Sequence, residues 1–353
     1  MAVPRNILVI RLSSLGDVLL TMPAVQALRQ TFPGVRLSWL VEGSVAELLR
    51  HQTFVDRVIE FPRRRIENAL RRGNAIGAGR ELSAFVRRLR QEAYDVVLDF
   101  HGIVKSALFT RCARTARRVG FDAAFAKEAS WLAYDEKIGA PDKRIHKVRR
   151  NMLLSAHLGA IDAAGVDLTV SEPAADYIDR FIAAGRIERP FFVVNPFCSK
   201  GSEFKRWDLA NYGELIRRIG DETGTPLVVL WGPGEEREAR ILAEMSEGRA
   251  MLACPTTVPQ ALALLKRAAL YIGGDTGVMH LAALAGLPVV AIFGPTDLLV
   301  NGPFGEGHTI VRADLECSPC RDKGCRSREC LQSITVDEVF TCVMASATQD
   351  RGN

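Results

Sequence analysis

Short apolar runs alternate with amphipathic stretches along the first half of the chain. The runs are nearly continuous, as in strands that are buried on both faces, and lie at residues 6–12, 36–41, 55–61 and 95–100. Residues 18–31 form an amphipathic stretch between the first two runs. Residues 79–94 also have helical spacing, with one apolar face made of Leu82, Phe85, Val86 and Leu89. The pattern predicts a parallel sheet covered by helices on both sides.

The second half repeats this alternation. Strands are expected at 191–195, 226–231, 250–254, 269–272 and 288–293, with helices between them at 209–220, 236–247, 258–268 and 278–285. We therefore predict an α/β protein with two Rossmann-like domains that face each other across a cleft. Ligands are expected at the carboxyl ends of the strands.

The domain boundaries follow from where buried-strand runs stop. Residues 164–190 contain none, so the predicted division is a domain at 1–170, a linker at 171–189 and a second domain at 190–335. Residues 336–353 are expected to form a helix that packs back on the first domain.

Composition places the chain among ordinary globular proteins. Its 353 residues are 48% hydrophobic and 25% charged, which excludes disordered, collagen-like and small disulfide-scaffold proteins. The longest apolar runs fall far short of the roughly 20 residues that span a membrane. The first residues lead into a strand without a secretion signal, so a cytoplasmic protein is expected.

The net charge of +5 hides an asymmetry. Residues 1–150 hold 27 basic and 15 acidic residues, a balance of +12, and the remainder holds a balance of −7. A basic first domain suits an anionic ligand, a membrane surface or a nucleic acid. Nucleic acid is not expected as a partner, because no helix-turn-helix, RNA-recognition or zinc-finger signature is present.

The turn Arg-Leu-Ser-Ser-Leu-Gly-Asp, residues 11–17, follows the first strand and opens a helix. Ligand clefts form at such turns, so Asp17 is a candidate general base toward an acceptor hydroxyl. From position alone, a helix-capping role for Asp17 is the better interpretation. The turn lacks G-x-G-x-x-G and a Walker-type Gly-Lys-Ser, so hydride transfer and P-loop chemistry find little support.

The strongest local signal is Gly-Gly-Asp-Thr-Gly-Val-Met-His at residues 273–280, between a strand and a helix. Thr276 and Gly277 at the helix start leave backbone N–H groups for a diphosphate, and the helix dipole attracts it. Asp275 and His280 are candidates to orient the sugar or a phosphate. The alternative is a glycine turn with an ordinary cap and a structural histidine.

Two further turns of the acidic half carry charged side chains. Lys200 and Lys205 lie in a polar loop after the first strand, where a lysine can neutralise charge on a phosphate leaving group. A solvated loop is the alternative. After the next strand, Glu235 and Glu236 are candidates to bind ribose hydroxyls, or they complement the helix N-terminus.

The basic half carries a run of arginines, Arg63, Arg64 and Arg65, followed by arginines 71 and 72. His101 and Lys105 come directly after the strand at 95–100. These cations either form a solvated face or bind an anionic acceptor.

Four of the eight cysteines form a C-x2-C-x4-C-x4-C segment: Cys317, Cys320, Cys325 and Cys330. Disulfides are not expected in a cytoplasmic chain. The segment is compatible with a structural zinc site, although its spacing is tighter than common zinc patterns, and reduced thiols in a loop are the alternative.

As a set, these segments resemble glycosyltransferase family 9, the heptosyltransferases of lipopolysaccharide inner-core synthesis. The resemblance covers nearly the whole chain and rests on Ser-Ser-Leu-Gly-Asp-Val-Leu at 13–19, Lys-Arg-Trp at 205–207, and residues 231–236, 274–280 and 293–297. Residues 99–107 and 126–131 look closest to the heptosyltransferase I branch, which attaches the first heptose to Kdo.

The resemblance implies a GT-B fold, an ADP-heptose donor, a Kdo-lipid A acceptor and inverting transfer without a catalytic metal or other cofactor. It makes Asp17 the general base and Lys205 the group that stabilises departing ADP. The donor would further contact Glu235 or Glu236, Asp275, Thr276, Gly277, His280 and Lys200, with Ser199 where the family has a threonine. The acceptor would contact Arg63, Arg64, Arg65, His101 and Lys105.

The family resemblance also implies a peripheral enzyme on the cytoplasmic face of the inner membrane. The four-cysteine segment departs from typical heptosyltransferase I, so a heptosyltransferase II- or III-like acceptor is an alternative. A nucleotide-sugar epimerase would keep the two-domain fold. A non-enzymatic membrane-surface protein would use only the arginine face.

Overall fold

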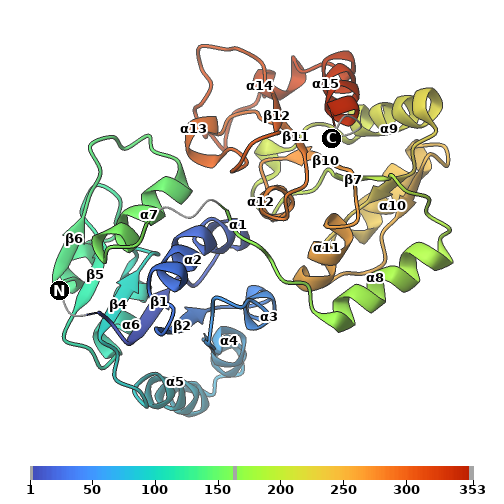
Figure 1. The fold of residues 1–353 in the computed structure, drawn as a ribbon. Coiled ribbons are helices and arrows are strands. Elements are labelled where there is room, and N and C mark those ends of the chain that lie inside the picture. The colour runs from blue at the N-terminus through green and yellow to red at the C-terminus, as the bar shows by residue number, and fades with distance from the viewer. Residues whose placement is uncertain (1–2, 162–164, 350–353) are drawn as a thin grey trace. The chain divides into compact units, whose positions relative to one another are not determined.

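The computed structural model describes residues 3–161 and 165–349 and divides the chain into two compact units, residues 1–169 and 170–353 (Figure 1). The first unit ends one residue before the predicted end of the first domain. No helix within the described ranges is both long and apolar enough to cross a bilayer.

The first unit contains one parallel sheet in the order β3-β2-β1-β4-β5-β6, the Rossmann order. The strand order reverses direction between β1 and β4, so the loops after these two strands flank the position at which such folds bind ligands. The strands are β1 (Asn6–Ile10), β2 (Arg36–Val41), β3 (Arg57–Glu60), β4 (Val96–Asp99), β5 (Arg118–Phe121) and β6 (Glu136–Ile138).

The helices of this unit cover both faces of the sheet. They are α1 (Leu15–Leu19), α2 (Met22–Thr31), α3 (Val45–Arg50), α4 (Arg63–Arg71), α5 (Ala75–Leu89), α6 (Val104–Cys112) and α7 (Lys147–His157). The single helix expected at 18–31 is thus two helices. Pro23 lies in the first turn of the second, where its missing N–H is tolerated. The arginine run, for which no helix was expected, forms α4.

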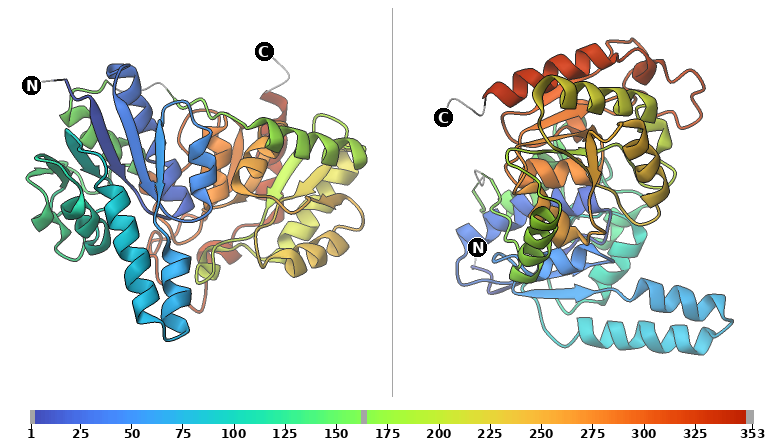
Figure 2. Two further views of the ribbon diagram at one scale, coloured as in Figure 1. Left: turned by 90° about the horizontal axis from the view of Figure 1, so that it is seen from below. Right: turned by 90° about the vertical axis from the view of Figure 1, so that its right-hand side faces the viewer.

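The packing of α4 and α5 creates a helical hairpin that projects from the sheet (Figure 2). At its base, the rings of Phe61, Phe85 and Phe109 pack with centroids 5.0–5.1 Å apart. These rings belong to a core that also contains Leu8, Ile10 and other strand residues. The hairpin is therefore anchored on the core side and exposed at its far end.

The second unit repeats the first, with a parallel sheet in the order β12-β11-β10-β7-β8-β9. Here the strand order reverses between β7 and β10. The strands are β7 (Phe192–Asn195), β8 (Leu227–Val229), β9 (Ala250–Leu252), β10 (Leu270–Gly274), β11 (Val289–Ile292) and β12 (Thr309–Val311). The predicted α/β class with two Rossmann-like parallel sheets is confirmed.

The four helices predicted between these strands all form, within a few residues of their expected bounds. They are α9 (Leu209–Thr223), α10 (Glu236–Met245), α11 (Val258–Leu265) and α12 (Gly277–Leu284). Short helices follow at α13 (Leu298–Asn301) and α14 (Glu329–Gln332).

A helix lies at each end of this unit and packs on its core. The expected linker contains α8 (Glu172–Ala184), which packs on α11 through Ala174 and Ile178. The final helix α15 (Val336–Gln349) was expected to pack back on the first domain. It packs on α9 and β11 of its own unit, because Val339, Phe340 and Val343 complete that unit's core.

Candidate functional site

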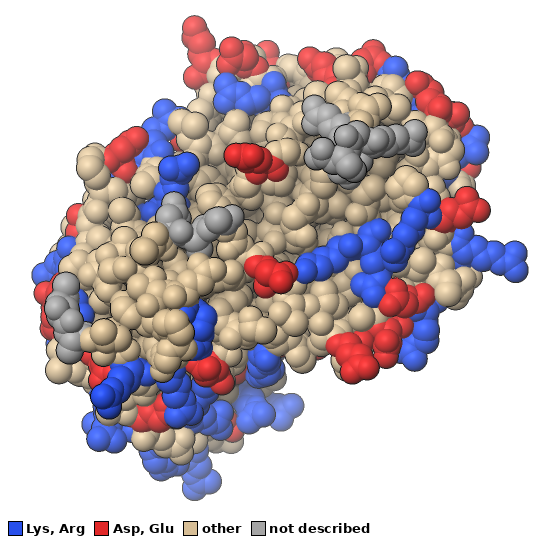
Figure 3. Space-filling view, in the orientation of Figure 1, with Lys and Arg blue, Asp and Glu red and all other residues tan. Residues whose placement is uncertain are grey.

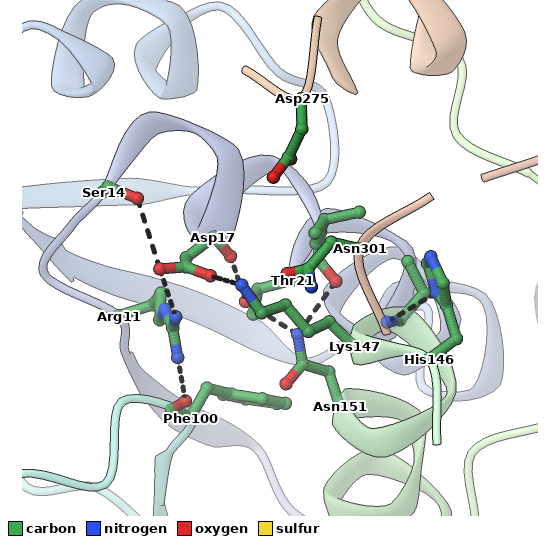
Figure 4. A network of polar contacts seen from close by, with 12 residues as sticks. Arg11, Ser14, Asp17, Thr21, Phe100, His146, Lys147, Asn151, Asp275 and Asn301 are labelled. Atoms are coloured by element: carbon green, nitrogen blue, oxygen red, sulfur yellow. Dashed lines mark hydrogen bonds and ion pairs between the residues drawn. The ribbon is translucent and has the colours of Figure 1, made fainter. Parts of the chain in front are cut away.

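Asp17 lies in the first turn of α1, directly after β1, and is surrounded by hydrogen-bond donors (Figure 4). Its Oδ2 atom is 3.0 Å from Arg11 Nη2 and accepts a hydrogen bond from Ser14 Oγ at 3.2 Å. Its Oδ1 atom accepts a hydrogen bond from Lys147 Nζ at 2.8 Å. Asp17 therefore holds two cations in ion pairs, which a simple helix cap does not require.

These cations determine the protonation state of Asp17. Burial alone would raise the pKa of this carboxyl group, but Arg11 and Lys147, with hydrogen bonds from Lys147 and Ser14, hold it well below its usual range. Burial lowers the pKa of Lys147, and the attraction of Asp17 opposes that effect. Asp17 is thus a carboxylate at every physiological pH.

Arg11 and Lys147 were missed in the sequence, although both have identifiable neighbours. Arg11 follows β1 directly and is only 5% exposed, and its Nη1 donates to the Phe100 carbonyl at 2.5 Å. Lys147 begins α7, which is held against α1 and α2 by Asn151, whose Nδ2 donates to the Leu20 carbonyl. A lysine 130 positions from Asp17 gives no local pattern, so only the packing of α7 reveals it.

A cavity of about 420 Å³ opens beside this turn in the first unit. It lies at the carboxyl ends of β1, β2 and β4, as expected for a Rossmann-like unit. Its lining combines cations, carboxylates and apolar side chains: Leu12, Ser13, Glu42, Phe61, Arg63, Ile66, Glu67, His101, Ile103 and Lys105.

Glu42, which the sequence analysis did not single out, organises the cations of this cavity. Its side chain is 6% exposed and forms ion pairs with Lys105 and, at 3.5 Å, with Arg63. Lys105 also lies over the Phe61 ring, with Nζ 4.6 Å from the centroid. The position of Glu42 directly after β2 was the only sequence signal for it.

His101 contributes a neutral ring to the cavity. Its Nδ1 accepts a hydrogen bond from the Leu12 amide at 3.1 Å, so the proton of the neutral ring lies on Nε2. Burial and the nearby Arg11 guanidinium lower the pKa of His101 to about 3. His101 thus carries no charge at neutral pH and has an N–H group available for donation from Nε2.

The predicted acceptor residues are only partly brought together. Arg63, His101 and Lys105 share the cavity, whereas Arg65 lines a separate hollow of about 160 Å³ between α4 and α5. Arg64 lies on the exposed surface of α4. The arginine run therefore divides, because successive residues of a helix point about 100° apart.

In the second unit, Lys205 and Asp275 form an ion pair. Their Nζ and Oδ2 atoms are 2.9 Å apart, and Asp275 is 8% exposed. Lys205 ends the short helix η2 (Glu203–Lys205) in the loop after β7, and Asp275 follows β10, so the pair flanks the reversal of strand order. Thr276 caps α12 by accepting from the Met279 amide at 3.3 Å, and Gly277 is its first residue.

The other predicted donor residues have varied surroundings. Glu235 Oε2 accepts from the Gly232 amide at 2.7 Å, and burial raises the pKa of this carboxyl group. Glu236 is exposed and pairs with Arg240. Ser199 and Lys200 are exposed on the loop after β7, and His280 is buried within α12.

The four-cysteine segment does not form a ligand set in this structure. Cys317 and Cys320 are exposed, Cys325 is partly exposed and Cys330 is buried in α14. In the described part of the chain, no group of three or more His, Cys, Asp and Glu side chains is arranged to hold a metal ion. The zinc site stays a prediction from spacing alone.

Curated relatives of this chain are lipopolysaccharide heptosyltransferases. It is 31% identical to lipopolysaccharide heptosyltransferase 1 of Pseudomonas aeruginosa PAO1 over 329 residues, which cover 91% of this chain and 87% of the relative. It is 32% identical to the protein of the same name from Escherichia coli K12 over 319 residues, covering 88% and 94%.

Solved structures agree over the full length. The structure of E. coli heptosyltransferase WaaC with ADP matches with a TM-score of 0.78 and 26% identity, covering 97% of this chain and 99% of that one. E. coli ADP-heptose lps heptosyltransferase II shares the fold, with a TM-score of 0.76, 20% identity and coverage of 98% and 100%.

The family signature matches a continuous segment of both units. It covers residues 82–331, described as glycosyltransferase family 9 (heptosyltransferase), and includes His101, Lys147, Lys205 and Asp275. With the two Rossmann-like units and relatives above 30% identity over most of the chain, this match shows the GT-B heptosyltransferase family expected from the motifs. The chain belongs to glycosyltransferase family 9.

Proposed function

We propose that this enzyme transfers heptose from ADP-heptose to a Kdo residue of the lipopolysaccharide inner core, with inversion and without a catalytic metal. The main support is its 31–32% identity, over about nine tenths of the chain, to relatives named lipopolysaccharide heptosyltransferase 1. The structures of E. coli heptosyltransferase WaaC with ADP and with ADP-2-deoxy-2-fluoro heptose support the donor.

The second unit would bind the donor. The amino end of α12 offers backbone N–H groups and the positive end of a helix dipole to a diphosphate. Lys205, paired with Asp275 just before this helix, adds a positive charge near it. Such an ammonium group can stabilise the charge on departing ADP, which is the task of a metal ion in other transferases. Turnover in the presence of a chelator is the expected result.

The first unit would bind the acceptor. Its cavity presents Lys105, Arg63 and the neutral His101 ring, which suit the carboxylate and hydroxyl groups of an acidic sugar. Glu42 holds both cations when the cavity has no ligand and keeps them from repelling each other. An acceptor carboxylate would then compete with Glu42 for them.

The proposed chemical step is a single displacement. The acceptor hydroxyl gives its proton to Asp17 as its oxygen attacks the anomeric carbon of heptose. The bond from that carbon to the diphosphate oxygen breaks on the opposite side, and ADP leaves with the electron pair. Because Arg11 and Lys147 keep Asp17 a weak base, proton transfer would come late, when the attacking oxygen has become acidic.

We place this reaction at the cytoplasmic face of the inner membrane, where the protein would be a peripheral enzyme. The net charge of +12 in residues 1–150 supports attraction to an anionic membrane surface. The nucleotide-sugar donor and the lipid-linked acceptor would meet there.

The experiment that tests the function measures ADP release from ADP-heptose with and without Kdo2-lipid A. Acceptor-dependent release supports donor and acceptor together. Stabilisation by ADP without release on this acceptor would favour a heptosylated acceptor, as in the heptosyltransferase II- or III-like alternative. If the enzyme neither binds ADP nor releases it from ADP-heptose, the proposal is overturned.

Lys147→Met is expected to raise the pKa of Asp17 toward the ordinary range of a carboxyl group and to move the acid limb of the pH profile of kcat/KM upward with it. Loss of the ammonium group raises the pKa of Asp17, and only the ionised carboxylate accepts the proton, so activity disappears at a higher pH as the solution is acidified.

Lys147→Arg keeps the charge and should restore the wild-type limb. Lys143→Met removes an exposed charge from the same segment and should leave the profile unchanged. If the acid limb of Lys147→Met matches that of the wild type, a group other than Asp17 controls this limb.

Lys105→Met is expected to raise the KM for the Kdo acceptor by about tenfold or more, since one charge-assisted contact of about 1.5–3 kcal/mol is lost. The affinity for ADP should not change. Steady-state kinetics in both substrates check this. Lys127→Met is the control, because it also removes one lysine from the same unit. An equal rise in KM in this variant would mean that Lys105 acts only through the general charge of the unit.

A further inference from the structure

The hairpin of α4 and α5 carries more positive charge than its own carboxylates balance. Residues 63–90 contain nine arginines and two glutamates, a net charge of +7. Arg63 pairs with Glu42 and Glu67. Among the residues that the structure describes, no carboxylate lies within ion-pair distance of the exposed arginines Arg64, Arg65, Arg71, Arg72, Arg80, Arg87 and Arg88.

Two exposed apolar side chains lie at the far end of the hairpin, close in sequence to Arg71 and Arg72. Leu70, in the last turn of α4, is 55% exposed, and Ile76, in the first turn of α5, is 72% exposed. They lie on either side of the tight turn through Gly73, at which φ is +71°. Lys and Arg side chains gather over this lower part of the first unit in Figure 3. Two large exposed apolar side chains on a helical hairpin rich in arginines without ion pairs are typical of a membrane-surface contact.

Helix α4 connects this end of the hairpin to the acceptor cavity. Arg63, Ile66 and Glu67 in its first half line the cavity, whereas Leu70 and Arg71 end it. The whole helix has nine residues, which is about 13 Å. A bilayer in contact with the hairpin end would therefore lie about one short helix away from the cavity.

We propose that the end of the α4–α5 hairpin is the membrane-docking element of this enzyme, with Leu70 and Ile76 inserted among anionic lipid headgroups and Arg71 and Arg72 bound to their phosphates. The docking itself does not depend on the proposed function. Its purpose does, because docking would bring a lipid-linked acceptor to the cavity. The charge and the exposed apolar pair favour an anionic bilayer over an acidic protein, because a bilayer surface offers headgroup phosphates and apolar chains side by side.

Vesicle sedimentation tests the docking step without catalysis. The full-length enzyme should bind vesicles of equal parts phosphatidylcholine and phosphatidylglycerol, bind pure phosphatidylcholine weakly, and be released by high salt. Arg71→Gln with Arg72→Gln should weaken binding about 25-fold, since each arginine near an anionic surface contributes roughly a factor of five. Leu70→Ser with Ile76→Ser should weaken it about tenfold.

Matched variants remove the same groups elsewhere. Arg180→Gln with Arg217→Gln removes two charges from the second unit, and Leu108→Ser with Leu132→Ser removes two exposed apolar side chains from the first. Both should bind vesicles as the wild type does. Equal binding by the hairpin variants, or equal binding of wild type to neutral and anionic vesicles, would overturn the proposal.

Activity separates this inference from the proposed function. The hairpin variants should transfer heptose normally to a delipidated Kdo acceptor in solution, and more slowly to the acceptor embedded in vesicles. If no acceptor is used at all, the proposed function fails, yet the sedimentation result still decides the docking surface. Equal loss on soluble and embedded acceptors would assign the hairpin to catalysis and overturn its docking role.

Discussion

Asp17→Asn should lower turnover by a factor of about 10² to 10⁴, the usual contribution of a general base, while the affinity for ADP stays within about twofold. The amide keeps the shape of the side chain but cannot accept a proton from the acceptor hydroxyl. Single-turnover ADP release and ADP titration measure the two quantities separately.

The same substitution also affects stability, because Arg11 and Lys147 lose the carboxylate that neutralises them. Breaking a buried ion pair costs about 3–5 kcal/mol, and partial exposure of Asp17 at 24% reduces that figure. The unfolding midpoint must therefore be measured with the kinetics. A folded Asp17→Asn protein with normal turnover would show that the base is another group.

Two variants separate chemistry from folding. Asp17→Glu keeps the charge and displaces the carboxylate, so it should fold well and remain slow. Asp135→Asn removes a carboxylate that pairs with Arg118 in the same unit and is 40% exposed, and it should have normal turnover. A slow Asp135→Asn protein would indicate a general effect of charge.

Lys205→Met is expected to lower kcat by a factor of about 10² to 10³, the usual effect of removing one group that stabilises transition-state charge. Its ammonium group would act mainly on departing ADP, so kcat should fall further than the affinity for the donor. The matched control is Lys323→Met, an exposed lysine of the same unit, which should behave as wild type.

The ion pair with Asp275 adds a second test. Asp275→Asn frees Lys205 and also removes the proposed heptose contact, so it should be slow by itself. Because the two side chains touch, the double variant should lose less than the sum of the single losses in transition-state free energy. Additive losses would mean that Lys205 and Asp275 act at separate points.

Local patterns in the sequence were sufficient for much of the architecture. Strands buried on both faces are continuous apolar runs, so every strand predicted in the two halves forms. The strands β5, β6 and β12 were not predicted, because their polar and charged neighbours leave no apolar run long enough to give a strand signal. Local patterns also could not predict where α15 packs, because an amphipathic helix does not specify which core it joins.

The candidate site divides in the same way. The sequence by itself determined the residues that follow a strand and open a helix, such as Asp17 and Asp275, because the chemistry of that turn is local. Only the tertiary structure decided their partners. Lys147 lies 130 positions from Asp17, Glu42 lies 63 positions from Lys105, and Asp275 lies 70 positions from Lys205. Ion pairs over such separations depend on how helices pack on the sheet, and a single sequence carries no periodic trace of that packing.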